Sequence, residues 1–230
     1  MKVRMKFSKN GPIKYIGHLD VMRYFQKAIR RAEIDIAYSQ GFSPHQIMSF
    51  AQPLGVGVES NGEYVDVELN TAKSSKDVLD KLNAVMNEGI EVLAVKKLPD
   101  GAQNAMASVA ASKYEISLKE GYEFGVDLFG QCMELYKKEH IFITKKTKKN
   151  ELEMDIKPAI YEMNVVEGKL ILFSDSSSAG NVKPNLLLEV ACKECQVEYN
   201  PLAFAIRRID MFTRNANGLL ISMDEVGEDF

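Results

Sequence analysis

The sequence predicts an α+β protein made of two tandem ferredoxin-like (β-α-β-β-α-β) domains. Alternating segments typical of strands occur between amphipathic segments typical of helices, and this order occurs twice. A linker at residues 99–110 separates the two series. With 230 residues and 46% hydrophobic content, the chain can bury a core in each half. The expected domains are 1–98, which carries a basic helix, and 111–230.

The first series is read from periodicity and turn residues. A helix is expected over His18–Ala32, because apolar residues recur there at three- and four-residue steps and predict one buried stripe. Ser74 or Ser75 is the expected cap of a second helix. Asn61-Gly62 is typical of a hairpin turn. The expected elements are Lys2–Ser8, Ile47–Val58, Glu63–Leu69 and Ile90–Lys97 as strands and His18–Ala32 and Ser74–Asn87 as helices, and the apolar stripe of the first helix is Leu19, Met22, Phe25, Ile29 and Ala32.

The second series is less regular. Glu167-Gly168 predicts a turn between two strands, and Pro184 suits the first turn of a helix. The run KKTKKN is expected at the tip of a basic hairpin, either tracking a phosphate backbone or simply forming an exposed loop. The expected strands are Ala111–Lys119, His140–Thr144, Glu151–Ile156, Tyr161–Val166, Lys169–Ser174 and Ala205–Arg214, and the expected helices are Glu123–Glu139 and Lys183–Cys195.

The first predicted helix carries four cations, Arg23, Lys27, Arg30 and Arg31, largely on one face. A solvated charged surface is one interpretation. Three arginines among the four favour an anionic partner, because the planar guanidinium group binds phosphate through two parallel hydrogen bonds. Residues 1–48 have a charge balance of +6, whereas the rest of the chain has −9. This asymmetry indicates local phosphate binding rather than coating of nucleic acid.

A turn follows the basic helix, and aromatic, small and imidazole side chains gather in it. Tyr38 and Phe42 flank Gly41, and His45 comes after Ser43-Pro44. Backbone amides near glycine, two aromatic rings and a nearby basic helix suit a phosphate with a stacked base. The alternative is an ordinary connector whose aromatic residues close the edge of the core.

These residues also carry a family resemblance. The motifs GHLD at 17–20, YSQGF at 38–42 and SFAQPLGVGVES at 49–60 resemble the radical-SAM-linked protein family, also called DUF2344, in its stand-alone form. The resemblance covers the first seventy residues or so and continues more loosely to about Arg214. The chain departs from the family's usual Asn-Pro-Arg at Ser43-Pro44-His45. The resemblance implies a radical SAM protein as partner and work on RNA, such as tRNA or rRNA.

Three functional hypotheses follow. The first is a non-catalytic RNA-binding or substrate-presenting module that acts with a radical SAM protein in RNA modification or processing. In it the four cations of the helix hold phosphate, while Tyr38, Gly41, Phe42 and His45 shape the binding site. The second is a protein-interaction subunit that docks on the radical SAM partner. The third is a metal-independent RNA endonuclease with His18 and His45 as weak candidates for general acid or base.

No metal or cofactor is expected in this chain. Cys192 and Cys195 form one CxxC pair, but a zinc site needs four ligands and no second pair follows. Cys132 and His140 are the remaining candidates for further ligands. The three cysteines fit a reducing compartment. No apolar run reaches the ~20 residues of a membrane span, and the N-terminal residues lack a signal-peptide core, so a cytoplasmic location is expected.

Overall fold

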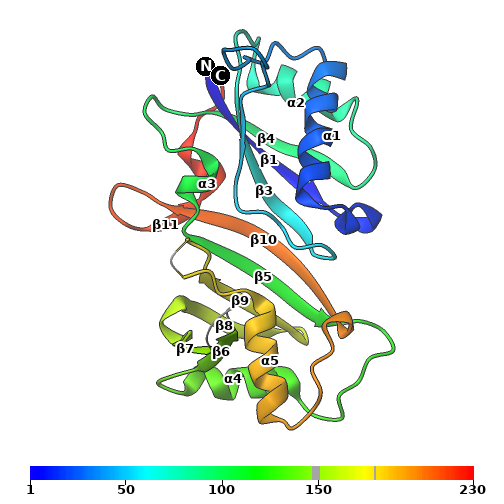
Figure 1. Cartoon of the computed structure of the whole chain (residues 1–230), viewed down its shortest axis with the longest axis vertical. Helices are drawn as coiled ribbons and strands as arrows, with labels where there is room; N and C mark the ends of the chain where they lie inside the picture. Colours follow the sequence, from blue (N-terminus) through cyan, green and yellow to red (C-terminus); the bar gives the residue numbers. More distant parts are fainter. Residues whose placement is uncertain (147–150, 179) are drawn as a thin grey trace. The chain divides into compact units, whose positions relative to one another are not determined.

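The structure is a computed structural model that describes residues 1–146, 151–178 and 180–230. The chain is an α+β protein with a large β-sheet, and its residues divide into two compact units (Figure 1). Unit 1 contains Met1–Ala110 and Asp210–Phe230, and unit 2 contains Ala111–Ile209. Residues 210–230 therefore belong with the N-terminal part of the chain, which differs from the expected domain of residues 111–230.

Unit 1 begins with the elements β1-α1-β2-β3-α2-β4. The strands have the order β4-β1-β3, and β2 pairs with β3 on its other side. All three of these pairings are antiparallel. The bounds are β1 Lys2–Lys9, α1 His18–Arg31, β2 Met48–Phe50, β3 Glu59–Glu68, α2 Ser75–Asn83 and β4 Ile90–Lys97, with a short 3-10 helix, η1, at Gly11–Tyr15.

The core of unit 1 forms because β1 alternates between two faces. Val3, Met5 and Phe7 are buried in one cluster with residues of both α1 and α2. The residues between them point the other way, as the two-residue period of a strand requires. Arg4 on that second face is buried as well. Both sides of β1 are therefore covered, one by apolar residues and one by a polar network.

The predicted first helix is confirmed as α1, and its stripe is largely correct. Val21, Phe25, Ala28 and Ile29 are buried on it. Leu19 is an exception, because it is 64% exposed, so its prediction as a core residue is wrong. The cap predicted for α2 is also confirmed, since the Ser74 hydroxyl accepts a hydrogen bond from the Asp77 amide.

The predicted hairpin turn at Asn61-Gly62 is wrong. Both residues lie inside β3, and the chain reverses earlier, between Phe50 and Glu59. Pro53 cannot donate to a strand ladder, and Gly57 has a φ of +86°, so the expected strand Ile47–Val58 ends at Phe50. The glycine-containing segment thus forms the connection, and Asn61-Gly62 is tolerated within a long strand.

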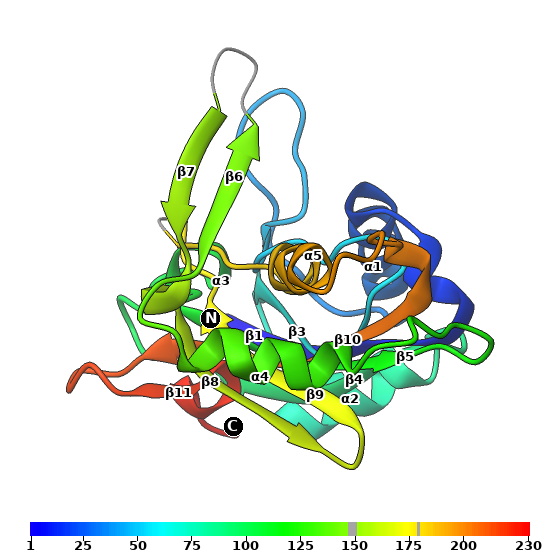
Figure 2. The same cartoon turned by 90° about the horizontal axis from the view of Figure 1, so that it is seen from below.

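Unit 2 has the order β5-α4-β8-β9-α5 and then the start of β10, a strand that continues into unit 1 from Asp210. A hairpin of β6 and β7 is inserted after α4. The strands follow the order β10-β5-β9-β8, and the turn at Glu167-Gly168 is confirmed between β8 and β9. Figure 2 shows β6 and β7 extending side by side away from α4. The bounds are β5 Ala111–Leu118, α4 Leu128–Lys137, β6 Phe142–Lys146, β7 Glu151–Asp155, β8 Ile160–Val166, β9 Lys169–Asp175, α5 Pro184–Glu194 and β10 Phe204–Arg214, with 3-10 helices η2 Lys157–Ala159 and η3 Pro201–Ala203.

Two expectations for unit 2 need qualification. The predicted helix Glu123–Glu139 is shorter, because Asp127 caps its first turn by accepting a hydrogen bond from the Gly130 amide. The tip of the predicted basic hairpin, residues 147–150, lies outside the described residues. α4 and α5 pack over one apolar core that includes Ile116 and Leu172 from the sheet.

The segment predicted as a linker is an ordered part of unit 1. It contains α3 (Ala105–Ser108), and Ala105 and Val109 are buried with Met211 and Met223. After β10, the chain continues as β11 (Leu220–Ser222), which pairs with β10, and the 3-10 helix η4 (Met223–Val226). The burial of Ala105 and Val109 against residues distant in the sequence explains why this segment is not a free linker. Across the described parts of the chain, no helix combines the length and the apolar character that a membrane span requires.

Candidate nucleic-acid interface

The four predicted cations form one surface of α1, here called the basic face: Arg23, Lys27, Arg30 and Arg31. All four are exposed. Residues three and four apart are neighbours on a helix, so Arg23, Lys27 and Arg30 lie together along one side. Arg31 continues the series at the C-terminal end, four residues after Lys27. The structure therefore brings together the cations as the sequence predicted.

The partners of these cations differ. Arg23 lies 3.3 Å from the Asp20 carboxylate in an exposed pair, and Arg31 donates to the Val85 carbonyl at 3.1 Å. Within the described part of the chain, the side chains of Lys27 and Arg30 have neither a hydrogen-bond nor an ion-pair partner. Because an exposed pair of this kind is weak, Arg23 can exchange the Asp20 carboxylate for another anion. Lys27 and Arg30 are consequently the cations best placed to bind an anionic ligand.

The residues after α1 form an exposed loop, here called the aromatic loop (residues 38–45). Its ends are joined by the Ser39 amide, which donates to the His45 carbonyl at 2.8 Å, and by a contact of 2.8 Å between the Ser39 hydroxyl and His45 Nδ1. Gly41 has a φ of +110°, a conformation that favours glycine. Phe42 is fully exposed, and Tyr38 is also exposed. The loop therefore presents two aromatic rings to solvent.

Gln46 attaches this loop to the basic helix. Its side-chain amide donates to the Gln26 carbonyl of α1 at 3.4 Å and contacts the Tyr38 hydroxyl at 3.5 Å. Gln26 is three residues after Arg23 and four before Arg30, so the three are neighbours on the helix surface. The base of the aromatic loop thus lies beside the basic face. Gln46 is buried, and its place in the site was not predicted from the sequence.

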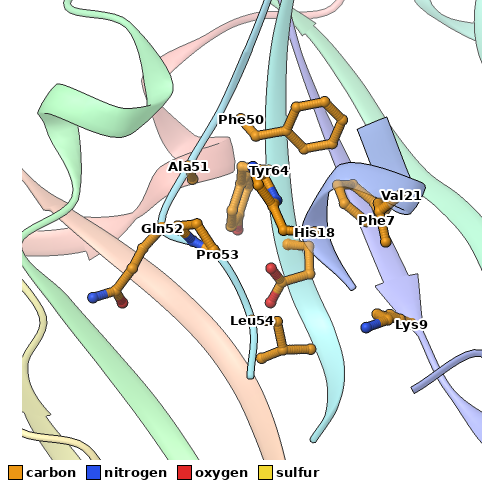
Figure 3. A pocket seen from close by; sticks show the side chains of 11 residues that line it. Phe7, Lys9, His18, Val21, Phe50, Ala51, Gln52, Pro53, Leu54 and Tyr64 are labelled. Carbon is orange, nitrogen blue, oxygen red and sulfur yellow. The ribbon is translucent and has the colours of Figure 1, made fainter. Parts of the chain in front are cut away.

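A small cavity, here called the His18 cavity, lies at the start of α1 in unit 1 (Figure 3). Its volume is about 20 Å³, which is enough for one water molecule. His18 is half-buried and meets the Phe50 ring edge-on at 5.5 Å between centroids. The lining residues are Phe7, Lys9, His18, Val21, Phe50, Ala51, Gln52, Pro53, Leu54, Glu63 and Tyr64.

The charged groups of this cavity are buried. Lys9 is 2% exposed, and its ammonium group donates to the carbonyls of Ile16 at 2.8 Å and Lys14 at 3.3 Å. Burial lowers the pKa of Lys9, and the nearby Glu63 carboxylate partly opposes that shift. Burial also lowers the pKa of His18, and the charge of Lys9 lowers it further. His18 is therefore a neutral imidazole at neutral pH, with one nitrogen that donates and one that accepts.

His18 is a candidate from the sequence, whereas Lys9 and Glu63 were not predicted. A signal for Lys9 exists, because it continues the series Val3, Met5, Phe7 at a two-residue step toward the core. The structure does not bring the two candidate histidines together. His18 lines the cavity, whereas His45 belongs to the aromatic loop and does not line it.

The three cysteines lie in or against the apolar core of unit 2. Cys132 and Cys192 are buried and Cys195 is partly buried. Burial raises the pKa of Cys132 to about 12, with smaller effects from Cys192 and Cys195, so this thiol stays protonated. Among the residues the structure describes, no group of three or more His, Cys, Asp or Glu side chains is arranged to hold a metal ion.

Comparisons with known proteins give one family match. The family model described as "Uncharacterized protein conserved in bacteria (DUF2344)" matches residues 2–184. No curated protein matches the chain. A solved structure, "Crystal Structure of a Cbf5-Nop10-Gar1 Complex", is similar with a TM-score of 0.45 and 11% identity. That match covers 91% of this chain and 48% of the other, so the chain spans about half of that protein's length.

Proposed function

The chain belongs to the DUF2344 family, and we propose that it binds single-stranded RNA through the basic face of α1 and the aromatic loop. The observation that carries this proposal is the contact between Gln46 and Gln26, which sets the base of a loop with two exposed aromatic rings beside a row of exposed cations. Proteins that bind single strands combine a basic track for phosphates with aromatic rings on which bases stack. The module is non-catalytic in this proposal and presents the RNA to another protein.

The same elements predict that RNA binding depends only weakly on the base sequence. Lys27 and Arg30 would hold phosphates, which are common to every nucleotide. Phe42 and Tyr38 would stack on bases, and stacking tolerates any base. An RNA modification or processing role, on tRNA or rRNA, is part of the proposal.

The finer fold assignment is also a proposal. The strands follow the order β4-β1-β3-β2 in unit 1 and β10-β5-β9-β8 in unit 2. Numbered along its own β-α-β-β-α-β series, each unit has its strands in the order fourth, first, third, second. This correspondence supports two tandem ferredoxin-like domains, with the β6–β7 hairpin as an insertion in the second.

A direct test is charge reversal at Lys27 and Arg30. The Lys27→Glu/Arg30→Glu variant should lose most RNA affinity while its melting curve stays close to that of the parent. For the parent, affinity should fall steeply with salt, and each phosphate contact removed should reduce the log–log slope by about 0.7. The matched control is Lys73→Glu/Lys193→Glu, which changes the net charge equally at two exposed positions elsewhere. Equal losses in both variants would contradict a specific interface.

A radical SAM protein is the proposed partner, on the strength of the motifs at residues 17–20, 38–42 and 49–60. Co-purification should recover such a protein with a defined stoichiometry that survives nuclease treatment. If the charge-reversal variant no longer co-purifies with this partner, and RNA has no effect on the co-purification by the parent, the basic face is a protein-docking surface instead. Cleavage of RNA by the parent protein without any partner would favour the endonuclease hypothesis.

A further inference from the structure

The His18 cavity contains hydrogen-bonding capacity that the protein does not use. Within the described residues, neither ring nitrogen of His18 has a hydrogen-bond partner. The Lys9 ammonium group has three N–H donors, and two of them are directed to the carbonyls of Lys14 and Ile16. An acceptor or donor on His18 and one donor on Lys9 therefore remain for a guest.

The size of the cavity restricts that guest. About 20 Å³ admits a water molecule or a hydroxyl group but not a nucleobase or a phosphate. The floor is formed by side chains that are almost fully buried, including Phe7, Lys9, Glu63 and Tyr64. Two of the other lining residues reach the surface, because Pro53 is exposed and His18 is half-buried.

The chemistry of the cavity suits a neutral group that both donates and accepts. Glu63 offsets the positive charge of Lys9, and His18 is neutral. A hydroxyl group can donate to an imidazole nitrogen while it accepts from the ammonium group. It would replace a water molecule and reproduce the hydrogen bonds of that water, which is the condition for a favourable exchange.

The cavity lies at the N-terminal end of α1, the helix that carries the basic face. Leu19 follows His18 in the first turn of α1, is exposed, and stands four residues before Arg23 of the basic face. His18 comes five residues before Arg23 and therefore lies about 140° around the helix from it. A strand held by Arg23 and its neighbours would reach the cavity by turning around the N-terminal end of α1.

We propose that the His18 cavity binds a ribose 2′-hydroxyl of the RNA and so discriminates RNA from DNA. This inference rests on the proposed function, since it assigns a subsite to the same bound strand. The 2′-hydroxyl is the group that distinguishes the two nucleic acids, and it is a donor and an acceptor as the cavity requires. A site built to hydrogen-bond a hydroxyl disfavours the analogue that lacks it, because its buried polar groups then lose their partner.

The experiment compares short single strands of one sequence as RNA, DNA and 2′-O-methyl RNA. RNA should bind the parent protein about three- to tenfold more tightly than DNA, which corresponds to one or two net hydrogen bonds. The 2′-O-methyl strand should bind no better than DNA, because a methyl group has no room. The His18→Phe variant retains an aromatic ring against Phe50 and should bind RNA as weakly as DNA, with its DNA affinity unchanged.

The control is His140→Phe, an exposed histidine of unit 2, which should keep the preference for RNA. A second measurement replaces one nucleotide of the RNA at a time by its 2′-deoxy analogue. It needs no protein variant, so it applies even if His18→Phe fails to fold. One position of the RNA should account for most of the preference for RNA over DNA. Equal binding of RNA and DNA by the parent, or a preference that survives in folded His18→Phe, overturns the inference but leaves RNA binding intact. Absence of binding to every strand overturns the proposed function as well.

Discussion

Arg4 and Asp66 form a two-point ion pair inside unit 1, with Nε of Arg4 2.8 Å from Oδ1 and Nη2 3.0 Å from Oδ2. Each side chain is 1% exposed. The same guanidinium group donates to the carbonyls of Gln103 at 3.3 Å and Met223 at 3.4 Å. One buried arginine therefore connects β1 to β3, to the segment before α3 and to η4.

The Asp66→Ala variant should lose about 3–5 kcal/mol of unfolding free energy, because it leaves the Arg4 charge buried without its counter-ion. Urea denaturation measures this loss. The control is Asp80→Ala, which breaks the exposed pair with Lys76 and should cost about 0.5 kcal/mol or less. Similar losses for the two variants would show that burial does not increase the contribution of the Arg4–Asp66 pair to the free energy of unfolding.

Stability should fall in acid partly through Asp224. Burial alone would raise the pKa of this carboxyl, but the hydrogen bond from Ser222 and the charge of Lys6 outweigh it, so the pKa lies below its ordinary 3.8. A carboxyl with a lowered pKa stabilises the fold above its unfolded value and loses that contribution as pH falls through its folded value. The parent should therefore lose stability below about pH 4.

The Asp224→Asn variant removes this titration. It should be less stable than the parent at neutral pH, and the gap between the two should narrow as the pH falls below about 4. Denaturation curves across this range measure the effect, with Asp100→Asn at an exposed position as the control. A gap that stays constant with pH would mean that Asp224 does not titrate between the folded and unfolded states.

Removing the ring of Phe42 should weaken RNA binding without affecting the fold. Stacking of a base on an aromatic side chain contributes about 1–3 kcal/mol, so Phe42→Ala should lower the affinity roughly five- to 150-fold. The melting temperature should not change, since the ring is fully exposed. Leu202→Ala removes an exposed apolar side chain in unit 2 and should leave the affinity as it is. An inert Phe42→Ala would exclude the ring from the interface.

The shape of the aromatic loop should matter as well as its side chains. Gly41→Val introduces a β-branched residue at a φ of +110°, although no heavy atom lies within 4 Å of the added Cβ. The strain is therefore in the backbone, and the loop should change conformation while secondary structure persists. His45→Ala removes the contact with the Ser39 hydroxyl.

Both variants should weaken RNA binding if the aromatic loop is part of the interface. If the loop is only a connector, Gly41→Val will lower the stability and His45→Ala will have no effect. Binding, RNA cleavage and melting measured on the same two proteins separate these outcomes. Binding retained with cleavage lost in His45→Ala would favour the endonuclease hypothesis.

Local patterns predicted the elements whose cause is local. The apolar period of α1, the Ser74 cap and the Glu167-Gly168 turn depend on residues close in sequence, and the structure has all three. Asn61-Gly62 has the composition of a turn, yet it lies within β3 at a shift in register, between the pairs Ser60–Lys9 and Glu63–Phe7 that join β3 to β1. Long-range pairing thus overrode a local preference.

The candidate site was likewise predictable only where its residues are close in the sequence. The basic face could be identified because its members lie on one helix. The His18 cavity could not, because Lys9 comes from β1, His18 from α1 and Glu63 from β3, and only the folded sheet brings them together. The extent of unit 1 was missed for a similar reason, since Tyr64 contacts Asp210 across 146 residues at 2.5 Å.

The division of the chain has a consequence for its synthesis on the ribosome. Unit 2 is one continuous stretch, whereas unit 1 needs Asp210–Phe230 in addition to its first 110 residues. Until those residues emerge, Lys6 and Tyr64 lack Asp210, and Lys97 lacks the backbone of Glu228. The half that is translated first is therefore completed last, and the nascent chain carries an unfinished N-terminal unit while residues 111–209 are translated.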